Sequence, residues 1–363
     1  MEKKTVLVAM SGGVDSSVAA ALLVRQGHRV IGVTMKTFCY QEAEAELTGP
    51  TRSCCGLDGI MDARAVANHL GIPHYVFDVE REFTRDVIDD FVHEYAAGRT
   101  PNPCVRCNGN TKFRDLLRRG KMLGCDAIAT GHYARMGADE QGRPVLLRGV
   151  DANKDQSYFL WALPPEMLPQ LMFPLGELTK PQVRQIAREM GLETAEKAES
   201  MEICFVPDGD YPRFLGKRLG ADHAALAPGA LVTTSGEVIG QHDGYARYTV
   251  GQRRGLGGGR SLPLYVIGTH PGRREVVVGT ADELHRAEVA IDELSWLATP
   301  PARGDAVHVQ IRHRAPAVAA TVAAIGNGEI RLDFEKPQRA VTPGQSAVIF
   351  RGDVVLGGGR IAS

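Results

Sequence analysis

The segment AMSGGVDSS, residues 9–17, decides the fold of this chain, because it directly follows the β-prone apolar run of residues 5–10. An apolar run that enters a Gly-Gly turn and continues into an amphipathic segment predicts a strand, a tight loop and a helix. Gly12 and Gly13 have the conformational freedom to bring backbone N–H groups close to an anion. The following helix points its positive end at the same place. The loop therefore predicts a phosphate site, although no Gly-Lys-Ser/Thr follows to make it a Walker A loop.

The SGGVDS segment resembles the pyrophosphatase loop of the N-type ATP pyrophosphatases, which cleave ATP between the α and β phosphates to adenylate a substrate. That resemblance implies that Asp15 holds Mg²⁺ against the pyrophosphate. The alternative is an ordinary Gly-Ser turn into a helix, which is what two glycines alone would indicate.

Strand and helix patterns alternate through the first 135 residues. We expect strands at 30–35, 75–79 and 127–130, and helices at 15–26, 57–70, 82–95 and 111–123. Repeated βα units predict an α/β fold with a doubly wound parallel sheet and ligands at the strand C-terminal ends. After about residue 208, short alternating runs bounded by Gly and Pro predict small β-domains. We expect a catalytic domain at 1–208, a central domain at 209–280 and a C-terminal β-barrel at 281–363.

The composition of the 363 residues is ordinary for a globular protein, with 44% hydrophobic and 23% charged residues. No apolar stretch reaches ~18 residues, so we expect no membrane span, and the N-terminus lacks a signal-peptide pattern. We therefore expect a cytoplasmic enzyme. The net charge is −1, but residues 98–121 hold seven bases and one acid, and residues 243–275 hold six arginines and two acids. Such local patches fit either a polyanion-binding face or solvated helix surface.

The second chemical signal is RTPNPCVRCNG, residues 99–109. Its prolines predict an extended loop and Gly109 a turn into the next helix. Nearby cations and a helix N-terminus would favour thiolate at Cys104 and Cys107. A third signal is Cys204, which lies in an apolar setting 97 residues beyond Cys107. Of the seven cysteines, Cys125 is expected to be structural, and the sequence assigns no role to Cys39, Cys54 or Cys55.

Taken together, these blocks resemble the tRNA-specific 2-thiouridylase (MnmA) family, a branch of the N-type ATP pyrophosphatases, over essentially the full length. The matching blocks, in the family's order, are the phosphate loop, TPNPxxxCN (100–108), KF (112–113), ATGHYAR (129–135), KDQSYFL (154–160), the ICF cysteine (203–205) and YTVGQRRGLG (248–257). The resemblance implies a catalytic domain with the adenine-nucleotide α-hydrolase-like (PP-loop) fold, and it implies that the central domain at 209–280 is a tRNA-binding adaptor.

The resemblance implies a tRNA-uridine 2-sulfurtransferase that uses ATP and Mg²⁺. Such an enzyme adenylates O2 of the wobble uridine in tRNAs for Lys, Glu and Gln, and sulfur then displaces AMP. It implies that Cys204 carries a persulfide and that Cys107 attacks it, freeing hydrosulfide or ending in a Cys107–Cys204 disulfide. The implied ATP contacts are Ala9, Met10, Ser11, Gly12, Gly13, Val14, Asp15, Ser16, Met35 and Gly131. The implied contacts to tRNA or the target base are Asn102, Pro103, Cys104, His132, Lys154, Asp155, Gln156, Arg312, His313 and Gln345.

One position departs from the family pattern. Many members carry Asp where this chain has Cys104, and that Asp is thought to activate the cysteine or the base. Cys104 and Cys107 at C-x-x-C spacing, with a distant Cys204, also match thiolases that hold a [4Fe–4S] cluster on three cysteines. The sequence leaves three interpretations open: the persulfide route, a cluster on these cysteines, and a passive substitution at Cys104.

Two other classes of protein compete with this interpretation. A small-molecule synthetase with the same loop would not need the cysteines or the basic β-domains, and a sulfur carrier without catalytic activity would not need SGGVDSS. The expected partners are tRNA and a cysteine desulfurase or sulfur-relay protein, and nothing argues against a monomer. The immediate sulfur donor and the preferred tRNA are not fixed by the sequence.

Overall fold

The computed structural model describes residues 2–37, 57–198, 203–256 and 263–362. It divides into two compact units. Unit 1 comprises Met1–Val87, Cys104–Gly209 and Asp353–Val355, and unit 2 comprises Ile88–Pro103, Asp210–Gly352 and Leu356–Ser363. The segment 88–103 therefore belongs to the same compact unit as most of the C-terminal half of the chain.

Unit 1 is built on a five-stranded parallel sheet with the order β3-β2-β1-β4-β7. Its strands are β1 (Thr5–Ala9), β2 (Arg29–Lys36), β3 (His74–Asp78), β4 (Ala127–Ala129) and β7 (Leu171–Met172). The chain leaves β1 toward β2 on one side and returns to β4 on the other, so the strand order reverses at β1. This reversal is the point at which doubly wound sheets bind ligands, and the predicted α/β fold is confirmed.

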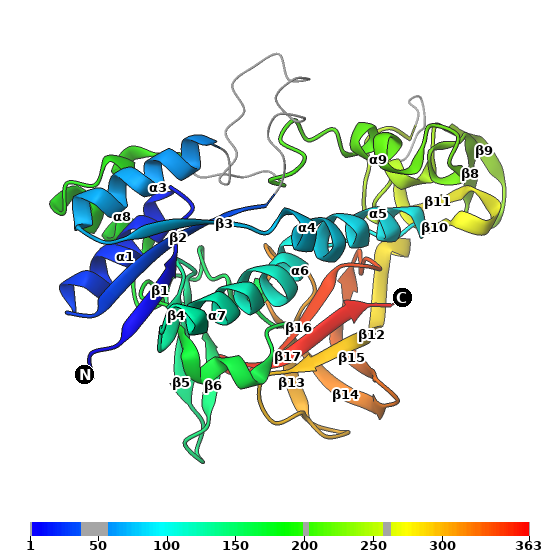
Figure 1. Cartoon of the computed structure of the whole chain (residues 1–363). Helices are drawn as coiled ribbons and strands as arrows, with labels where there is room; N and C mark the ends of the chain where they lie inside the picture. Colours follow the sequence, from blue (N-terminus) through cyan, green and yellow to red (C-terminus); the bar gives the residue numbers. More distant parts are fainter. Residues whose placement is uncertain (1, 38–56, 199–202, 257–262, 363) are drawn as a thin grey trace. The chain divides into compact units, whose positions relative to one another are not determined.

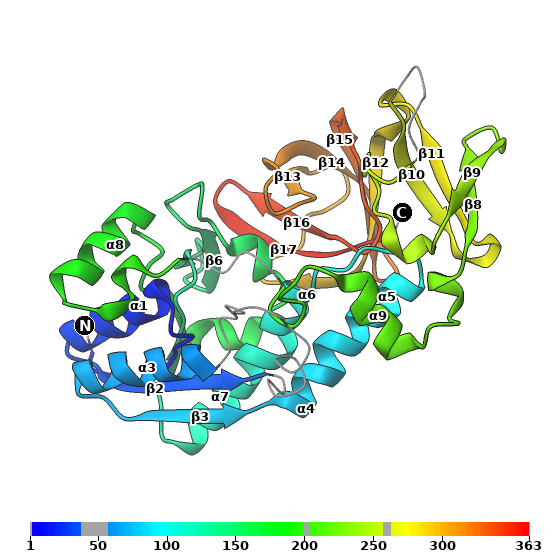
Figure 2. The ribbon, with the colours of Figure 1, turned by 90° about the horizontal axis from the view of Figure 1, so that it is seen from above.

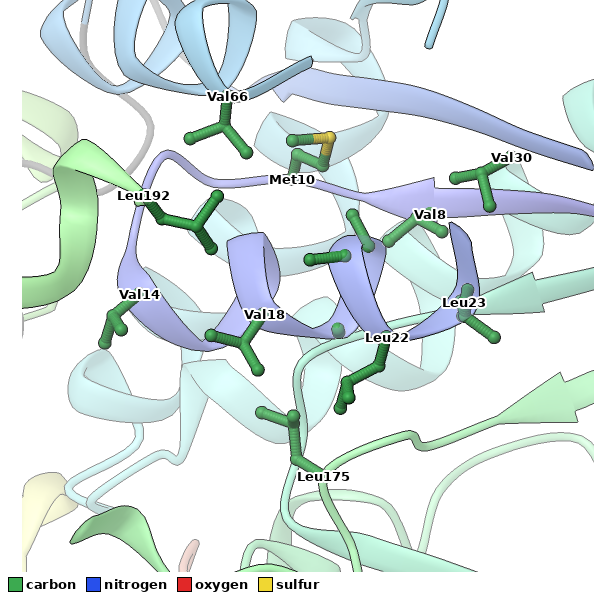
Figure 3. Close-up of a cluster of buried hydrophobic side chains, with 14 of the residues drawn as sticks. Val8, Met10, Val14, Val18, Leu22, Leu23, Val30, Val66, Leu175 and Leu192 are labelled. Carbon is green, nitrogen blue, oxygen red and sulfur yellow. The ribbon is translucent and has the colours of Figure 1, made fainter. Parts of the chain in front are cut away.

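The two faces of the sheet are covered by different helices. Val6 and Val8 of β1 join a buried cluster with α1 (Val14–Arg25), α3 (Leu57–Leu70) and α8 (Lys180–Glu189), whereas Leu7 lies on the opposite face within reach of Gly120 in α7 (Phe113–Met122). Figure 1 shows α3 and α7 on opposite sides of the sheet, and Figure 3 shows the buried side chains around α1 and the end of β1. This apolar packing fixes where the loop after β1 must lie.

Two expected helices have a different local structure. The predicted helix 82–95 consists of α4 (Glu80–Phe83), a π-helical turn η1 (Thr84–Ile88) and α5 (Asp89–Ala96). Figure 2 shows α4 directly after the end of β3. The expected loop before residue 111 is also helical, as α6 (Pro103–Arg106) and a π-helix η2 (Cys107–Lys112), which runs into α7. Pro103 starts the helix instead of holding the chain extended, because proline suits the first helical position. π-Helical turns are frequent at functional sites.

The rest of unit 1 consists of short elements. They are β5 (Ala134–Ala138) and β6 (Pro144–Arg148), which pair as an antiparallel hairpin, and the 3₁₀ turns η3 (Ser157–Phe159), η4 (Pro165–Gln170) and η5 (Glu193–Glu196). Helix α8 begins after Thr179, whose N–H donates to Gln182 Oε1 at 2.8 Å. Across the described ranges, no helix is both long enough and apolar enough to cross a bilayer.

Unit 2 contains two β-structures. A four-stranded sheet has the order β10-β11-β8-β9, from β8 (Gly229–Thr233), β9 (Val238–His242), β10 (Tyr265–His270) and β11 (Glu275–Gly279), and α9 (Tyr211–Leu219) precedes it. The predicted C-terminal barrel is confirmed: six antiparallel strands close through the pairing of β12 with β17. They are β12 (His285–Trp296), β13 (Ala306–Gln310), β14 (Val318–Gly326), β15 (Glu329–Arg339), β16 (Ser346–Arg351) and β17 (Val354–Ile361). The remaining 3₁₀ turns are η6 (Ala224–Leu226), η7 (Tyr245–Arg247), η8 (Pro271–Arg273) and η9 (Asp282–Leu284).

Candidate active site

The loop between β1 and α1 is held in a tight curve by its own serines. Ser16 Oγ accepts from the Ser11 N–H at 3.1 Å, and the hydroxyls of Ser16 and Ser17 donate to the Gly13 carbonyl at 3.1 and 2.9 Å. Gly12 has φ +71°, and a Cβ there would lie 2.3 Å from the Gly59 carbonyl oxygen. Glycine is therefore required at residue 12 both for the backbone conformation and for the close approach of α3.

The end of β4 lies directly against this loop. A Cβ on Gly131 would fall 2.7 Å from the Ser16 nitrogen and 2.8 Å from the Asp15 carbonyl carbon. The segment after β4 thus meets the first turn of α1 at the C-terminal edge of the sheet. Of the predicted ATP residues, the structure brings together the loop residues and Gly131. The side chains of Met10 and Met35 are buried under this edge. The ATP contacts themselves stay a prediction.

Asp15 is held by two side chains that the sequence analysis did not single out. Lys180 Nζ lies 2.8 Å from both carboxylate oxygens, and the Tyr133 hydroxyl donates to Oδ1 at 2.8 Å. The Lys180 side chain is 9% exposed, whereas that of Asp15 is 32% exposed. A clue was present in the sequence, since Lys180 is the first residue of a helix, where the macrodipole disfavours a cation. The loop therefore presents a carboxylate and a buried ammonium together.

The cysteine segment is shaped by close packing. Cys107 begins the π-helix η2 and is buried, while Cys104 in α6 is exposed. A Cβ on Gly109 would come within 2.7 Å of the Ala162 carbonyl oxygen. Gly109 is thus needed for a close approach inside a helix, not for the turn that the sequence suggested.

Helix α4 links the two segments that carry Cys107 and Cys204. Phe83 of α4 packs edge-on against Phe205, the neighbour of Cys204, with ring centroids 5.8 Å apart. Helix α4 also contacts η2, which begins at Cys107. Cys204 is half-buried. Two cysteines far apart in sequence are therefore carried by segments that flank the same short helix.

The iron–sulfur alternative rests on three cysteines that all lie in the described part of the chain. No group of three His, Cys, Asp or Glu side chains in this part of the chain is arranged to hold a metal ion. Cys104, Cys107 and Cys204 all lie in the described ranges, and they differ in exposure. A cluster on these cysteines stays a prediction, and no step is derived through it. The predicted Mg²⁺ site is a different case, because Mg²⁺ commonly takes one or two carboxylates and completes its shell with phosphates and water.

His132 lies between aromatic rings next to η2. Its ring centroid is 5.9 Å from that of Phe113 and 6.3 Å from that of Phe173, and its Nδ1 is 2.7 Å from the Thr130 hydroxyl. Burial, followed by the positive charge of Lys112, lowers the pKa of His132 to about 3. His132 is therefore neutral at physiological pH, so any tRNA contact that it makes is a hydrogen bond or a stacking contact and not an ion pair.

The predicted tRNA residues 154–156 hold a turn of unit 1. Asp155 accepts from the Gly149 N–H and the Ser157 N–H at 3.0 Å, and from the Arg148 guanidinium at 3.0 Å. Gln156 Oε1 accepts from the Tyr133 N–H at 3.0 Å. The Asp155 and Gln156 side chains thus orient the chain around Tyr133. The tRNA role of Lys154–Gln156 stays a prediction.

The predicted tRNA residues of unit 2 occupy two different settings. Arg312 and His313 are exposed at the end of β13, and Gln310 Nε2 donates to their carbonyls at 3.2 and 2.8 Å. Gln345 is half-buried, and its amide nitrogen donates to the carbonyls of Thr100 and Pro101 at 2.9 and 3.1 Å. Arg312 and His313 therefore remain exposed to a ligand, whereas Gln345 contacts the segment that leads to Asn102, Pro103 and Cys104.

Much of the positive charge in residues 98–121 is paired. Arg99 makes a bidentate contact with Glu94, and Arg118 and Arg119 both contact Asp115, at 2.6 and 2.7 Å. Arg99 is thus part of the fold and does not simply supply positive charge to the cysteines, as its position in the sequence suggested. In contrast, Arg253 and Arg254 of unit 2 are exposed.

A glycine-rich loop at the switch point of a parallel sheet, with a carboxylate and a buried lysine in it, defines an ATP-utilising α/β enzyme of the pyrophosphatase-loop class. Three family models match the chain. The model described as tRNA methyl transferase HUP domain matches residues 4–208, the tRNA methyl transferase PRC-barrel domain matches residues 214–280, and the aminomethyltransferase β-barrel domain matches residues 286–361. The chain belongs to the tRNA-specific 2-thiouridylase family. The domain boundaries at 208 and 280 stay a prediction.

The curated relatives match over nearly their whole length. The tRNA-specific 2-thiouridylase of Geobacter metallireducens is 50% identical over 359 residues, which is 99% of this chain and 97% of the relative. That of Symbiobacterium thermophilum is 48% identical over 364 residues, covering 99% and 92%. Among solved structures, a 4-thiouridine synthetase–RNA complex with bound ATP aligns with 60% of this chain and 51% of its own, at 16% identity and a TM-score of 0.34.

Proposed function

We propose that this chain is an ATP-dependent tRNA-uridine 2-sulfurtransferase. It adenylates O2 of the wobble uridine in tRNAs for Lys, Glu and Gln and replaces that oxygen with sulfur, acting as a monomer. The observation that carries the proposal is the coexistence of a phosphate loop holding Asp15 and Lys180 with two cysteine segments that flank α4. Curated relatives of this family, about half identical over the whole chain, support the same activity.

The phosphate loop accounts for the activation step. Backbone N–H groups at the start of α1 bind phosphate oxygens, and the Lys180 ammonium stabilises the negative charge that develops on the departing pyrophosphate. Uridine O2 attacks the α phosphorus, the bond to the bridging oxygen breaks, and pyrophosphate leaves with the electron pair. Asp15 would hold Mg²⁺, which when bound neutralises phosphate charge.

The cysteines account for sulfur transfer. A cysteine desulfurase or relay protein loads Cys204 with a persulfide, and the Cys107 thiolate attacks Cys204 Sγ. The persulfide S–S bond breaks, hydrosulfide leaves, and a Cys107–Cys204 disulfide forms, which an external thiol reduces. Hydrosulfide attacks C2 of the activated uridine, and AMP leaves with the former O2. Asn102, Pro103 and Cys104 line the target base, which must be splayed out of the anticodon stack.

The decisive experiment is a thiolation assay with unmodified tRNA for Lys or Glu, ATP, Mg²⁺ and a sulfur source, read as 2-thiouridine by mass spectrometry. Iron-free protein is compared with anaerobically reconstituted protein. We expect full activity without iron and loss of activity in Cys107→Ser and Cys204→Ser, with Cys125→Ser as the matched control. Activity only in reconstituted protein would replace the persulfide route by a cluster.

The same assay separates the competing functions. A sulfur carrier without catalysis would still deliver sulfur in an Asp15→Ala variant, whereas an adenylating enzyme would not thiolate tRNA. A small-molecule synthetase would release pyrophosphate without tRNA and form no 2-thiouridine. Either result would overturn the proposal.

A further inference from the structure

We propose that Lys197 is a positioning residue for the phosphate loop, which turns the Gly12–Gly13 peptide so that the Gly13 N–H faces the phosphate site, and that Lys197 does not itself contact ATP. The inference rests on the proposed function, because it assigns a residue to the ATP site of that function. Lys197 lies far from the loop along the chain, and all the residues involved belong to unit 1.

The Lys197 ammonium binds the phosphate loop at one backbone carbonyl. Its Nζ donates to the Gly12 carbonyl at 2.9 Å across 185 positions, and it also forms an ion pair with Asp62 of α3. The same helix meets Gly12 a second time, because a Cβ on Gly12 would lie 2.3 Å from the Gly59 carbonyl oxygen. Lys197 and α3 therefore fix Gly12 together.

The direction of this bond determines where the next backbone donor points. The peptide between Gly12 and Gly13 is trans, so its C=O and N–H point in opposite directions. Since the carbonyl faces the Lys197 ammonium, the Gly13 N–H faces away from it, and Gly13 directly precedes the phosphate-binding end of α1. A cation at the carbonyl oxygen also polarises the peptide and makes its N–H a stronger donor. Lys197 can thus strengthen phosphate binding without touching the ligand.

This peptide needs an external contact to hold its direction. It lies between two glycines, which restrict backbone rotation less than any other residue. The hydroxyls of Ser16 and Ser17 both donate to the carbonyl of Gly13, one peptide further along the loop. The bond from Lys197 therefore fixes the peptide that these serine hydroxyls do not bind.

The backbone around Lys197 is itself held in place. Its N–H donates to the Thr194 carbonyl at 3.1 Å, and its carbonyl accepts from the Arg184 guanidinium of α8 at 3.2 Å. The same guanidinium donates to the Ala195 carbonyl at 2.6 Å. Figure 3 shows Leu192, just before this turn, in the buried cluster around α1. The Lys197 side chain is 35% exposed, but its anchored backbone gives the ammonium a defined position beside the loop.

The test is Lys197→Met, which keeps the apolar stem and removes the charge and the donors. We expect α,β-methylene ATP with Mg²⁺ to bind roughly tenfold more weakly, because a hydrogen bond from a charged group to the loop is lost, whereas adenosine, which has no phosphate, should bind within about twofold of wild type. Arg188→Met is the matched control and should change neither affinity, because the Arg188 side chain pairs with Glu196 of the neighbouring turn.

Asp62→Asn separates orientation of the loop from a direct contact with phosphate. If Lys197 orients the loop, loss of this partly exposed ion pair should leave ATP affinity unchanged or weaken it by up to about fivefold. Tighter ATP binding would show that Lys197 leaves Asp62 to bind phosphate itself, and would overturn the proposal. Unchanged ATP affinity in Lys197→Met would also overturn it, as would equal losses of ATP and adenosine affinity.

A second variant protects the test against misfolding. If Lys197→Met does not fold, Lys197→Gln keeps a neutral donor and should show the same contrast between ATP and adenosine. Wild-type protein that binds ATP but forms no 2-thiouridine would contradict the proposed function, and the contrast between the two ligands would still test the role of Lys197.

Discussion

Asp15 in unit 1 and Glu94 in unit 2 are both carboxylates held by cations at nearly the same distances, yet they differ in how far they are exposed. Asp15 lies 2.8 Å from Lys180 Nζ, and Glu94 lies 2.8 Å from Arg99 Nε and 2.7 Å from Arg360. The Asp15 side chain is 32% exposed, whereas that of Glu94 is fully buried. A pair that a ligand can reach is available for chemistry, and a pair enclosed in the fold can only contribute to stability. The comparison shows that the exposure of the carboxylate, and not the ion-pair distance, distinguishes a pair that a ligand can reach from one that is enclosed in the fold.

The largest expected effect is on the enclosed pair. Glu94→Gln leaves Arg99 and Arg360 beside a neutral side chain, and removing one partner of a buried ion pair costs about 3–5 kcal/mol. Urea unfolding should show this loss. Glu196→Gln is the control, since Glu196 forms its 2.7 Å contact with Arg188 on the surface and is 74% exposed. Equal stability losses in Glu94→Gln and Glu196→Gln would show that enclosing the Glu94 pair adds no stability.

The second effect is on the accessible pair. Lys180→Met should lower tRNA-dependent pyrophosphate release by about 10²–10³-fold, because a preorganised charge at the leaving group is lost. Lys121→Met, at an exposed lysine of α7, is the control and should leave the rate unchanged. Thermal unfolding should change less in Lys180→Met than in Glu94→Gln. Nearly full pyrophosphate release would show that the Lys180–Asp15 pair is structural after all.

The stability that the buried Glu94 carboxylate contributes through Arg99 and Arg360 should depend on pH in the wild-type protein. Burial alone would raise the pKa of Glu94, but the Arg99 hydrogen bond and the charges of Arg360 and Arg99 hold it below its usual range. A lowered folded-state pKa adds stability above the unfolded pKa of about 4.3, and this stability disappears as pH falls through the folded value. The stability gap between wild type and Glu94→Gln should therefore be full at pH 7 and shrink below about pH 4. A constant gap would contradict the assignment.

The smallest effect concerns the exposed arginines of unit 2. Arg253→Ala or Arg254→Ala should weaken tRNA binding modestly and reduce the slope of log K against log salt by about 1, if each contacts one phosphate. The rate of thiolation at saturating tRNA should not change. A salt slope equal to that of wild type would place these arginines outside the tRNA interface.

Local patterns in the sequence predicted the fold well. The apolar runs and Gly-terminated amphipathic segments gave the parallel sheet, and the predicted helix at 57–70 has the bounds of α3. They could not show the π-helical turns η1 and η2, because five or six residues are too few for helical periodicity to be read from the sequence. Pro103 was interpreted as keeping the chain extended, although proline is also compatible with the first residue of a helix.

Long-range contacts account for what the sequence analysis missed at the site. Lys180 meets Asp15 across 165 positions, and Gln345 meets Thr100 across 245. Glu94 lies in an acid-rich run, residues 78–94, which is typical of solvated helix surface, yet it is fully buried. The spacing of residues along the sequence does not distinguish these side chains from exposed neighbours, because their partners come close only in the folded chain.

The bond between Arg360 and helix α5 has a consequence during protein synthesis. Arg360 NH2 reaches Asp90 Oδ1 at 2.8 Å across 270 positions, and the same guanidinium contacts Glu94. A ribosome adding about 5–20 residues per second makes Glu94 many seconds before Arg360. Through that interval helix α5 of the nascent chain lacks its ion-pair partner Arg360. The segment at residues 99–103, which follows α5, cannot yet take its final position. Newly made protein should therefore bind nucleotide before it is able to act on RNA.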